Sequence, residues 1–348
     1  MAFKSVGTFD LGMQVAGGAQ AAQAGAARFA SMDAAGIASG QAFLTAELEK
    51  RDMLVRTPLT SFTYPRDIPV RVGGGWAEFV SAMQVGYGVA GGSGDNLVHA
   101  GGSNGIPMVQ ADFSKDVWKT HLVSMGTRVM WIDMQRGNMT GRNMDTLLRD
   151  GLRMAYDKHM DENTYVGFKR YGTTGLLNDE DAVVTNAAAT GANSGTTFKS
   201  KTSDQLLDDI NTAILTAWAA SEYDRDAIPN HIIMPYEQYN YLATTRVSEL
   251  AEKTILSFLL ENNVAKQNGG DLVIGATSWC KGAGVGGKDR MAVYSNKERY
   301  LAMDELAPLT RAMTSQNTEQ FCYDTAYAAN LSEVEVFYSQ TMIYVDGI

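Results

Sequence analysis

The clearest periodic pattern of hydrophobic positions lies between residues 140 and 164. Apolar and small side chains that would share one helical face recur there every three or four residues: Met144, Leu147, Leu148, Gly151, Leu152 and Ala155. A helix of roughly 24 residues, rising about 1.5 Å per residue, would be about 36 Å long. We expect Thr140 to be its N-cap and Thr164 to lie near its end, followed by a turn-rich connection from Gly167 to Asp179.

Before that helix, from Thr57 to Lys119, the pattern is typical of strands and loops. Prolines interrupt this segment at four positions: Pro58, Pro65, Pro69 and Pro107. Residues 68–72 form an extended piece, and glycines are concentrated between Gly86 and Gly105. Two strand-like runs around a glycine-rich tip predict a long hairpin, and such a hairpin needs a partner because two isolated strands are only marginally stable.

Residues 1–50 are rich in alanine and glycine. These small side chains cannot build a core, and each glycine weakens a helix by about 1 kcal/mol relative to alanine. We therefore expect an extended arm instead of a domain. Its end, Phe43 to Arg51, places Phe43, Leu44 and Leu48 on one stripe and predicts a short amphipathic helix.

Helical and strand patterns alternate in the rest of the chain. One helix is expected with five apolar residues on one face, capped by Ser203 or Asp204. These residues are Leu206, Leu207, Ile210, Ile214 and Trp218. A second helix is expected from Ser248 to Asn263. Short strands are expected at residues 231–235, 272–275, 290–294, 300–303 and 334–345. The predicted fold class is α+β.

Composition narrows the possible functions. The chain has 348 residues, 45% hydrophobic and 20% charged, which is typical of a folded protein. Its net charge of −10, without a run of Lys or Arg, argues against tight binding to nucleic acid. No apolar stretch reaches the roughly 20 residues of a membrane span, and the N-terminus lacks the pattern of a secretory signal, so we expect assembly in the cytoplasm.

One segment resembles a phosphate-binding loop. Gly282 to Asp289 fits the G-x-x-x-x-G-K pattern, but Asp289 stands where the motif needs Ser or Thr, and a strand follows where it needs a helix. Two segments also fit G-x-G-x-x-G, at Gly282, Gly284 and Gly287 and in the hairpin tip at Gly86 to Gly91, without a helix after either. We interpret both as loops.

The remaining candidate residues point to structural roles. The four histidines are His99, His121, His159 and His231, and none forms a metal-binding pair. Cys280 and Cys322 are isolated, which favours inert buried thiols. The 18 methionines suit packing that must adapt to different surroundings. The sequence therefore assigns no catalytic residue, no cofactor and no metal site, and predicts that the chain is not an enzyme.

The order of these elements, together with short strings, resembles the Hong Kong 97-type major capsid fold of tailed phages. The strings are Phe43-Leu44-Thr45-Ala46-Glu47-Leu48-Glu49 followed by Ile68-Pro69-Val70, and Gly167 followed by Gly175-Leu176-Leu177-Asn178, which is similar to the connection after the spine helix in capsid proteins and encapsulins. The resemblance covers nearly the whole chain. It implies an icosahedral phage head of hexamers and pentamers that encloses double-stranded DNA, so the protein would be part of the virion.

The resemblance also implies a division of the chain. Residues 1–57 would be the N-terminal arm and 73–116 the extended loop. Residues 58–75, 117–171 and 330–348 would form the peripheral domain, with the spine helix at about 140–164. Residues 172–329 would form the axial domain. The implied partners are other copies of the chain, scaffolding and portal proteins, a decoration protein, and DNA through weak contacts only, with no membrane.

Two departures from the family pattern matter. Some members crosslink a lysine of the extended loop to a neighbour, but residues 76–114 contain no lysine, which predicts a non-covalent shell. Only about 50 arm-like residues precede the loop, which favours a separate scaffolding protein. The alternatives are an encapsulin-type nanocompartment, a nucleotide-binding enzyme that uses the loop at Gly282 to Lys288, and a β-rich surface or tail protein.

Overall fold

The computed structural model describes residues 58, 60–90, 108–140, 144–248 and 253–348. The chain divides into a unit of residues 1–59 and a unit of residues 60–348, and the description below concerns the second unit. The predicted arm and its helix at Phe43 to Arg51 lie outside the described residues, as does the hairpin tip.

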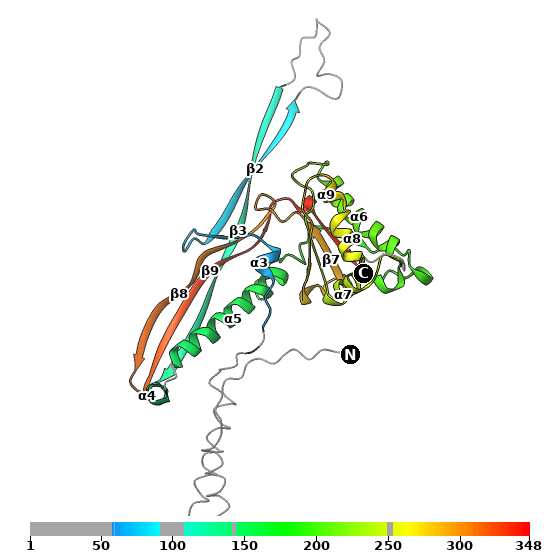
Figure 1. Ribbon diagram of the computed structural model, residues 1–348. Coiled ribbons are helices and arrows are strands. Elements are labelled where there is room, and N and C mark those ends of the chain that lie inside the picture. The colour runs from blue at the N-terminus through cyan, green and yellow to red at the C-terminus, as the bar shows by residue number, and fades with distance from the viewer. Residues whose placement is uncertain (1–57, 59, 91–107, 141–143, 249–252) are drawn as a thin grey trace, which may run out of the picture. The chain divides into compact units, whose positions relative to one another are not determined.

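The first sheet contains the predicted hairpin. Its strands, in spatial order, are β1 (Val70–Val72), β8 (Leu301–Asn317), β9 (Cys322–Val336), β3 (Met108–Met130) and β2 (Phe79–Ala90). β1 runs parallel to β8, whereas the other neighbours are antiparallel. β3 changes partner along its length, because it pairs with β2 up to Lys119 and with β9 from Thr120. The hairpin is therefore a direct extension of this sheet (Figure 1).

The predicted long helix is α5 (Met144–Val166), with 23 residues against the expected 24 or so. It contacts β3 and β9 and buries Leu152, Tyr156 and Met160 among others. Thr140 is not its N-cap, so that prediction was wrong. Thr140 ends a separate helix, α4 (Trp131–Thr140), which follows β3 without an intervening loop and therefore has no turn residues to mark its start.

The Gly175-Leu176-Leu177-Asn178 string caps the end of α5. The amides of Leu176 and Leu177 donate to the carbonyls of Thr164 and Tyr165 at 2.8 and 3.1 Å, and Asn178 Nδ2 donates to Val166 O at 3.0 Å. These bonds satisfy carbonyls that every helix leaves free at its C-terminus. Gly175 is required because a Cβ there would lie 2.6 Å from the backbone nitrogen of Gly167. The chain thus reverses tightly as it leaves the helix.

The second sheet has the order β4-β10-β7-β5-β6. Its strands are β4 (Val183–Asn186), β10 (Met342–Asp346), β7 (Arg290–Tyr294), β5 (His231–Met234) and β6 (Val273–Ala276). The helices of this region are α6 (Ser203–Ala220), α7 (Tyr236–Thr244), α8 (Ile255–Glu261) and α9 (Val264–Gln267). All residues of β5, β7 and β10 are buried.

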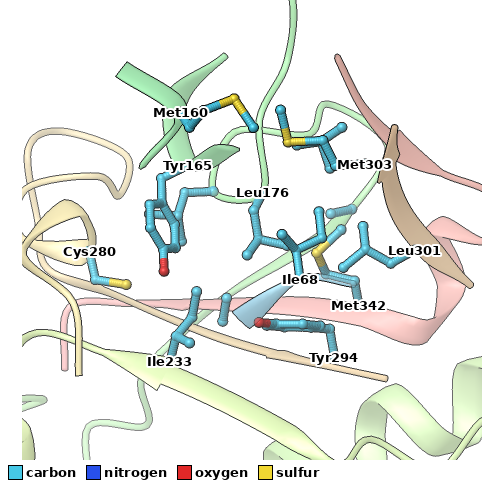
Figure 2. Packing of buried hydrophobic residues seen from close by; sticks show 14 of the residues in the cluster. Ile68, Met160, Tyr165, Leu176, Ile233, Cys280, Tyr294, Leu301, Met303 and Met342 are labelled. Atoms are coloured by element: carbon cyan, nitrogen blue, oxygen red, sulfur yellow. The ribbon is translucent and has the colours of Figure 1, made fainter. Parts of the chain in front are cut away.

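Two clusters of apolar side chains stabilise the unit. One joins both sheets to α5. Figure 2 shows Met160 of α5 near Met303 of β8, and Tyr165, Ile233 and Tyr294 belong to the same cluster. The other cluster lies between the second sheet and its helices and includes Leu206, Ile210, Ile232 and Val293. Successive side chains of β5 point to opposite faces of the sheet, so Ile233 belongs to the first cluster and Ile232 and Met234 belong to the second.

The structure corrects several predicted boundaries. The closing strand at 334–345 is two strands, because Ser339–Thr341 forms a turn of 3-10 helix between β9 and β10. β10 pairs with β4 and β7 of the second sheet, whereas β8 and β9 belong to the first sheet, which α5 contacts. The grouping of 330–348 with the long helix, and of 172–329 as one region, therefore does not follow the sheets.

Two helix predictions also change. Residue Thr202, not Ser203 or Asp204, caps α6, and it forms a capping box with Gln205. Within the described part of the expected helix at 248–263, only Ile255–Glu261 is helical, with Thr254 as its N-cap. Thr254 takes the N-cap position, not a position inside the helix, because its hydroxyl accepts a hydrogen bond from the amide of Ser257.

Candidate assembly surfaces

The β2–β3 hairpin is a regular ladder whose two faces differ in chemistry. Its strands pair without a register shift from Phe79 with Lys119 to Ala90 with Met108. Side chains of directly paired residues lie on the same face. One face therefore carries a row of apolar side chains: Phe79, Met83, Val85, Tyr87, Val109, Phe113 and Val117. The other face carries mainly small and polar side chains: Ala82, Gln84, Gly86, Gly88, Gln110, Asp112, Ser114 and Asp116.

The apolar face is not covered by the described residues of the chain. Met83 is 80% exposed, Tyr87 77% and Phe113 72%. Large contiguous apolar patches of this kind on a folded protein mark interaction sites. Two lysines share this face: Lys119 lies at its end nearest the sheet, and Lys115 lies within the apolar row, opposite Met83. This face is the strongest candidate in the described residues for contact with another protein surface.

The base of the hairpin is fixed to the sheet by side-chain contacts. Gln84 Nε2 donates to Asp116 Oδ2 at 2.5 Å and to Phe337 O at 3.1 Å. The rings of Trp118 and Phe337 meet edge to face, with centroids 5.3 Å apart. Asn330 Nδ2 donates to Ala77 O at 2.9 Å, in the segment that enters β2. These contacts anchor the base of the hairpin to β9 and to the residues that follow it.

A second polar centre links the short helix α3 (Tyr64–Asp67) to α5. Asp161 Oδ1 accepts hydrogen bonds from the amides of Thr63 and Tyr64 at 2.7 and 3.1 Å. Its other oxygen accepts from Trp279 Nε1 at 2.6 Å. One carboxylate therefore satisfies two free amides at the start of α3 and holds α3, α5 and the loop before β7 together.

The end of α3 carries a second buried carboxylate. Asp67 Oδ1 contacts His231 Nε2 at 2.9 Å and Arg66 Nε at 2.6 Å, and Tyr165 OH donates to Oδ2. Tyr294 OH donates to the Asp67 carbonyl at 2.6 Å. Burial alone would raise the pKa of Asp67, but the hydrogen bonds from His231, Arg66 and Tyr165 outweigh burial and hold this pKa below its ordinary value. This ionised carboxylate connects α3 and α5 to β5 and β7.

The glycine-rich loop that resembles a phosphate-binding motif has no free cradle of amides. The amide of Gly284 donates to Lys288 O, that of Gly287 to Gly284 O and that of Gly282 to Asp289 Oδ1. The amide of Val285 donates to Asp346 Oδ2 at 2.9 Å. A phosphate would need these amides and would face two carboxylates. The next element is strand β7, as the sequence predicted, so the loop lacks the geometry of a nucleotide site.

The described histidine and cysteine candidates have structural contacts, and His121 and His159 both lie against Phe168. His121 stacks between Phe168 and Tyr171, and burial lowers its pKa. His159 lies on α5 with its ring against Phe168. Cys280 and Cys322 are free and buried, as the sequence predicted for these two thiols. Burial raises the pKa of Cys280. Among the described residues, no group of three or more potential ligands could hold a metal ion.

Comparison with known proteins identifies the family of the chain. A family model described as major capsid protein matches residues 94–348. The chain belongs to the major capsid protein family. As a bacteriophage capsid protein it is a structural component of the virion shell, self-assembles with other copies, and is not an enzyme. The comparison with curated proteins finds no match.

Solved structures, two of them titled as capsids, share the fold of this capsid protein over most of its length. The capsid of Myoviridae phage XM1 has a TM-score of 0.71 at 20% identity and covers 87% of this chain and 98% of that chain. The capsid of a native GTA particle has a TM-score of 0.60 at 10% identity, with 91% and 99% covered. Microbacterium phage Oxtober96 has a TM-score of 0.58 at 13% identity, with 88% and 97% covered. The protein has the Hong Kong 97-type capsid fold that its sequence resembles.

The sequence indicated the hairpin of this capsid protein but not the difference between its faces. The alternation of Phe79, Met83 and Tyr87 with small residues was the available signal for one apolar face. Asp67 and Asp161 carried no such signal. Asp67 meets His231 164 positions along the chain, and Asp161 meets Thr63 98 positions away, so no local spacing relates them.

Proposed function

We propose that the protein forms hexamers and pentamers that close into an icosahedral head around double-stranded DNA. The observation that carries the proposal is the exposed apolar face of the β2–β3 hairpin, with Met83 and Phe113 largely open to solvent. An isolated chain gains nothing from these side chains, whereas a neighbouring copy that covers them removes apolar surface from water. The hairpin is in this proposal the extended loop that lies across the next subunit.

The two sheets suggest how each subunit is arranged in a capsomer. We assign the sheet with α5 to the peripheral domain, with α5 as the spine helix. The second sheet and α6 to α9 correspond to the axial domain at the capsomer centre, with β10 included because it pairs with β4 and β7. Residues 1–57 remain assigned as the N-terminal arm and residues 73–116 as the extended loop.

The shell is proposed to be non-covalent. The stretch from Trp76 to Ser114, which makes up most of the extended loop, contains no lysine, so this stretch lacks the amine that a lysine–asparagine crosslink requires. Single bands at the mass of the monomer on a denaturing gel of purified particles are expected. A ladder of oligomers that survives boiling and reducing agent would contradict this part of the proposal.

The acidic chain suits a container that packs DNA without binding it tightly. A net charge of −10 repels phosphate backbones, so contact with packaged DNA would be weak and non-specific. A separate scaffolding protein, a portal protein and a decoration protein are proposed as further partners. Assembly is proposed to take place in the cytoplasm of the bacterial host. Among the described residues, no helix is long and apolar enough to cross a membrane.

Electron microscopy of particles tests the proposal directly. The chain is expressed alone and together with the neighbouring phage genes, and each sample is analysed by negative-stain microscopy and light scattering. Closed icosahedral shells or capsomer rings are expected, with closed shells favoured by the neighbouring genes. Small uniform shells formed by the chain alone would favour an encapsulin-type compartment, and a monomer or dimer under every condition would contradict both.

A further inference from the structure

A cluster of one half-exposed arginine and two carboxylates, of which Glu335 is fully buried, lies where β1 meets β8 and β9. Arg71 Nε donates to Asp304 Oδ1 at 2.5 Å, and Arg71 Nη2 donates to Glu335 Oε2 at 2.7 Å. The Glu335 side chain is 0% exposed and that of Asp304 is 15% exposed. Arg71 and Asp304 are direct partners in the parallel β1–β8 pairing, so the backbone register holds the cluster in place.

The charges of this cluster do not balance when both carboxylates are ionised. One guanidinium faces two negative groups, which leaves one negative charge in a buried site. The second oxygen of Glu335, Oε1, is buried and has no hydrogen-bond partner among the described residues. Each oxygen of an ionised carboxylate accepts hydrogen bonds from donors, so burial takes water away from this oxygen and no donor in the described part of the chain replaces it.

The electrostatics of Glu335 agree with its geometry. Burial first, and then the negative charge of Asp304, raise the pKa of Glu335 from 4.5 to about 7. The Ser332 hydroxyl and the Arg71 guanidinium lower this pKa but only partly offset the other two effects. Glu335 can therefore exchange a proton with solvent near neutral pH, in contrast to an exposed glutamate.

We propose that Glu335 is a proton-binding site that strengthens the attachment of β1 to the sheet when it is protonated. The proton comes from solvent and converts the carboxylate into a neutral carboxyl group. The cluster then holds one negative and one positive charge, and Arg71 pairs with Asp304 alone. Because the folded pKa lies above the unfolded one, the stabilisation is complete below about pH 4.5 and is lost as the pH rises through about 7.

The position of the cluster connects this proton to the proposed assembly surface. β1 is an edge strand of three residues that pairs with β8 alone, so it depends on side-chain contacts such as Arg71. The Arg71 guanidinium lies over the ring of Phe337, 5.6 Å from its centroid, and Phe337 contacts Trp118 at the base of the hairpin. A change in the ion pairs of Arg71 would therefore alter its contact with Phe337, and Phe337 in turn contacts Trp118, which anchors β3.

Other ionisable groups near the cluster have their own partners. On β8, Glu305 accepts a hydrogen bond from Tyr156 OH of α5 at 2.8 Å. On β3, Asp116 is bonded to Gln84, and the Lys119 backbone bonds to the neighbouring Glu333. Burial also raises the pKa of Glu333, so the test must separate that residue from Glu335.

Hydrogen–deuterium exchange of the full chain tests the proposal. Exchange in peptides that contain β1 is followed from about pH 5 to about pH 9 and corrected for the intrinsic rate. In the wild type, protection is expected to rise below about pH 7, by up to about tenfold per pH unit. Glu335→Gln is expected to give a flat profile, protected at pH 8 as well. The matched control is Asp324→Asn. It removes a partly exposed carboxylate of β9, the strand of Glu335, that pairs with Arg128 of β3, and it should keep the wild-type profile.

A second variant keeps the test decisive if Glu335→Gln does not fold. Asp304→Asn removes the like charge that raises the pKa of Glu335, so the inflection of the β1 profile should move to lower pH. A structural loss alone would lower protection at every pH without moving the inflection. A wild-type profile that is flat, a Glu335→Gln profile with the wild-type slope, or an unmoved inflection in Asp304→Asn would each overturn the proposal.

Discussion

The β2–β3 hairpin and the second sheet place their apolar side chains in opposite environments. In β5, β7 and β10 every residue is buried, whereas the apolar face of the hairpin is open to solvent. Apolar side chains contribute to folding only when the chain itself covers them. The second sheet is therefore stabilised within one subunit, whereas under the proposed function the hairpin gains apolar stabilisation when copies associate.

The largest expected effect comes from a charge on the apolar face of the hairpin. Phe113→Glu places a carboxylate where a neighbour would bury it, and an unpaired buried charge is strongly unfavourable. We expect loss of shells in negative-stain images of the co-expressed sample. Because Phe113 is largely exposed, the circular dichroism spectrum of the unassembled chain should not change.

The adjacent residue supplies a matched control for this substitution. Ser114 is also exposed but pairs with Gln84 on the opposite face of the ladder. Ser114→Glu adds the same charge one position along the strand and should still assemble. Normal yields of shells from Phe113→Glu, or equal losses from both variants, would show that the apolar face is not the contact surface.

The second prediction compares the second sheet and the hairpin by the free energy of unfolding that each substitution removes. Ile232 of β5 is 0% exposed, so Ile232→Ala should lower the free energy of unfolding of the unassembled chain by about 2 to 5 kcal/mol, because it leaves a cavity. Met83→Ala removes a side chain of similar size from the hairpin and should change that free energy by less than about 0.5 kcal/mol. Urea denaturation followed by fluorescence compares the two. A large loss in Met83→Ala would mean that the hairpin packs within its own subunit.

The same contrast explains how far the sequence predicted the structure. Local patterns predicted α5, the hairpin, β5 and β7, because helical or alternating spacing records which face each segment buries. The limits of the two sheets could not be predicted in this way. β10 belongs to the second sheet through its pairing with β4 and β7, which lie about 160 and 50 positions earlier, and no local pattern records a distant partner.

The candidate site was predicted in part for the same reason. The glycine-rich tip indicated a hairpin, but the anchoring contacts of Trp118 with Phe337 and of Arg71 with Glu335 join residues more than two hundred positions apart. The weak motif at Gly282 could be rejected from its own residues, since Asp289 and the following strand already conflicted with it. Local conflicts are visible in a sequence, whereas contacts across sheets are not.

The smallest expected effect concerns the N-cap of α6. The sequence predicted Ser203 or Asp204 as this cap, whereas the structure has Thr202. Thr202 Oγ1 accepts from the Gln205 amide at 3.4 Å, and Gln205 Oε1 accepts from the Thr202 amide at 2.9 Å. Thr202→Ala should therefore lower the free energy of unfolding by about 1 kcal/mol. Ser203 instead donates to Arg246 O at 3.1 Å on the surface, so Ser203→Ala should cost less. Neither substitution changes the apolar face of the hairpin, so neither should remove the proposed contact surface. A larger loss in Ser203→Ala would favour the cap expected from the sequence.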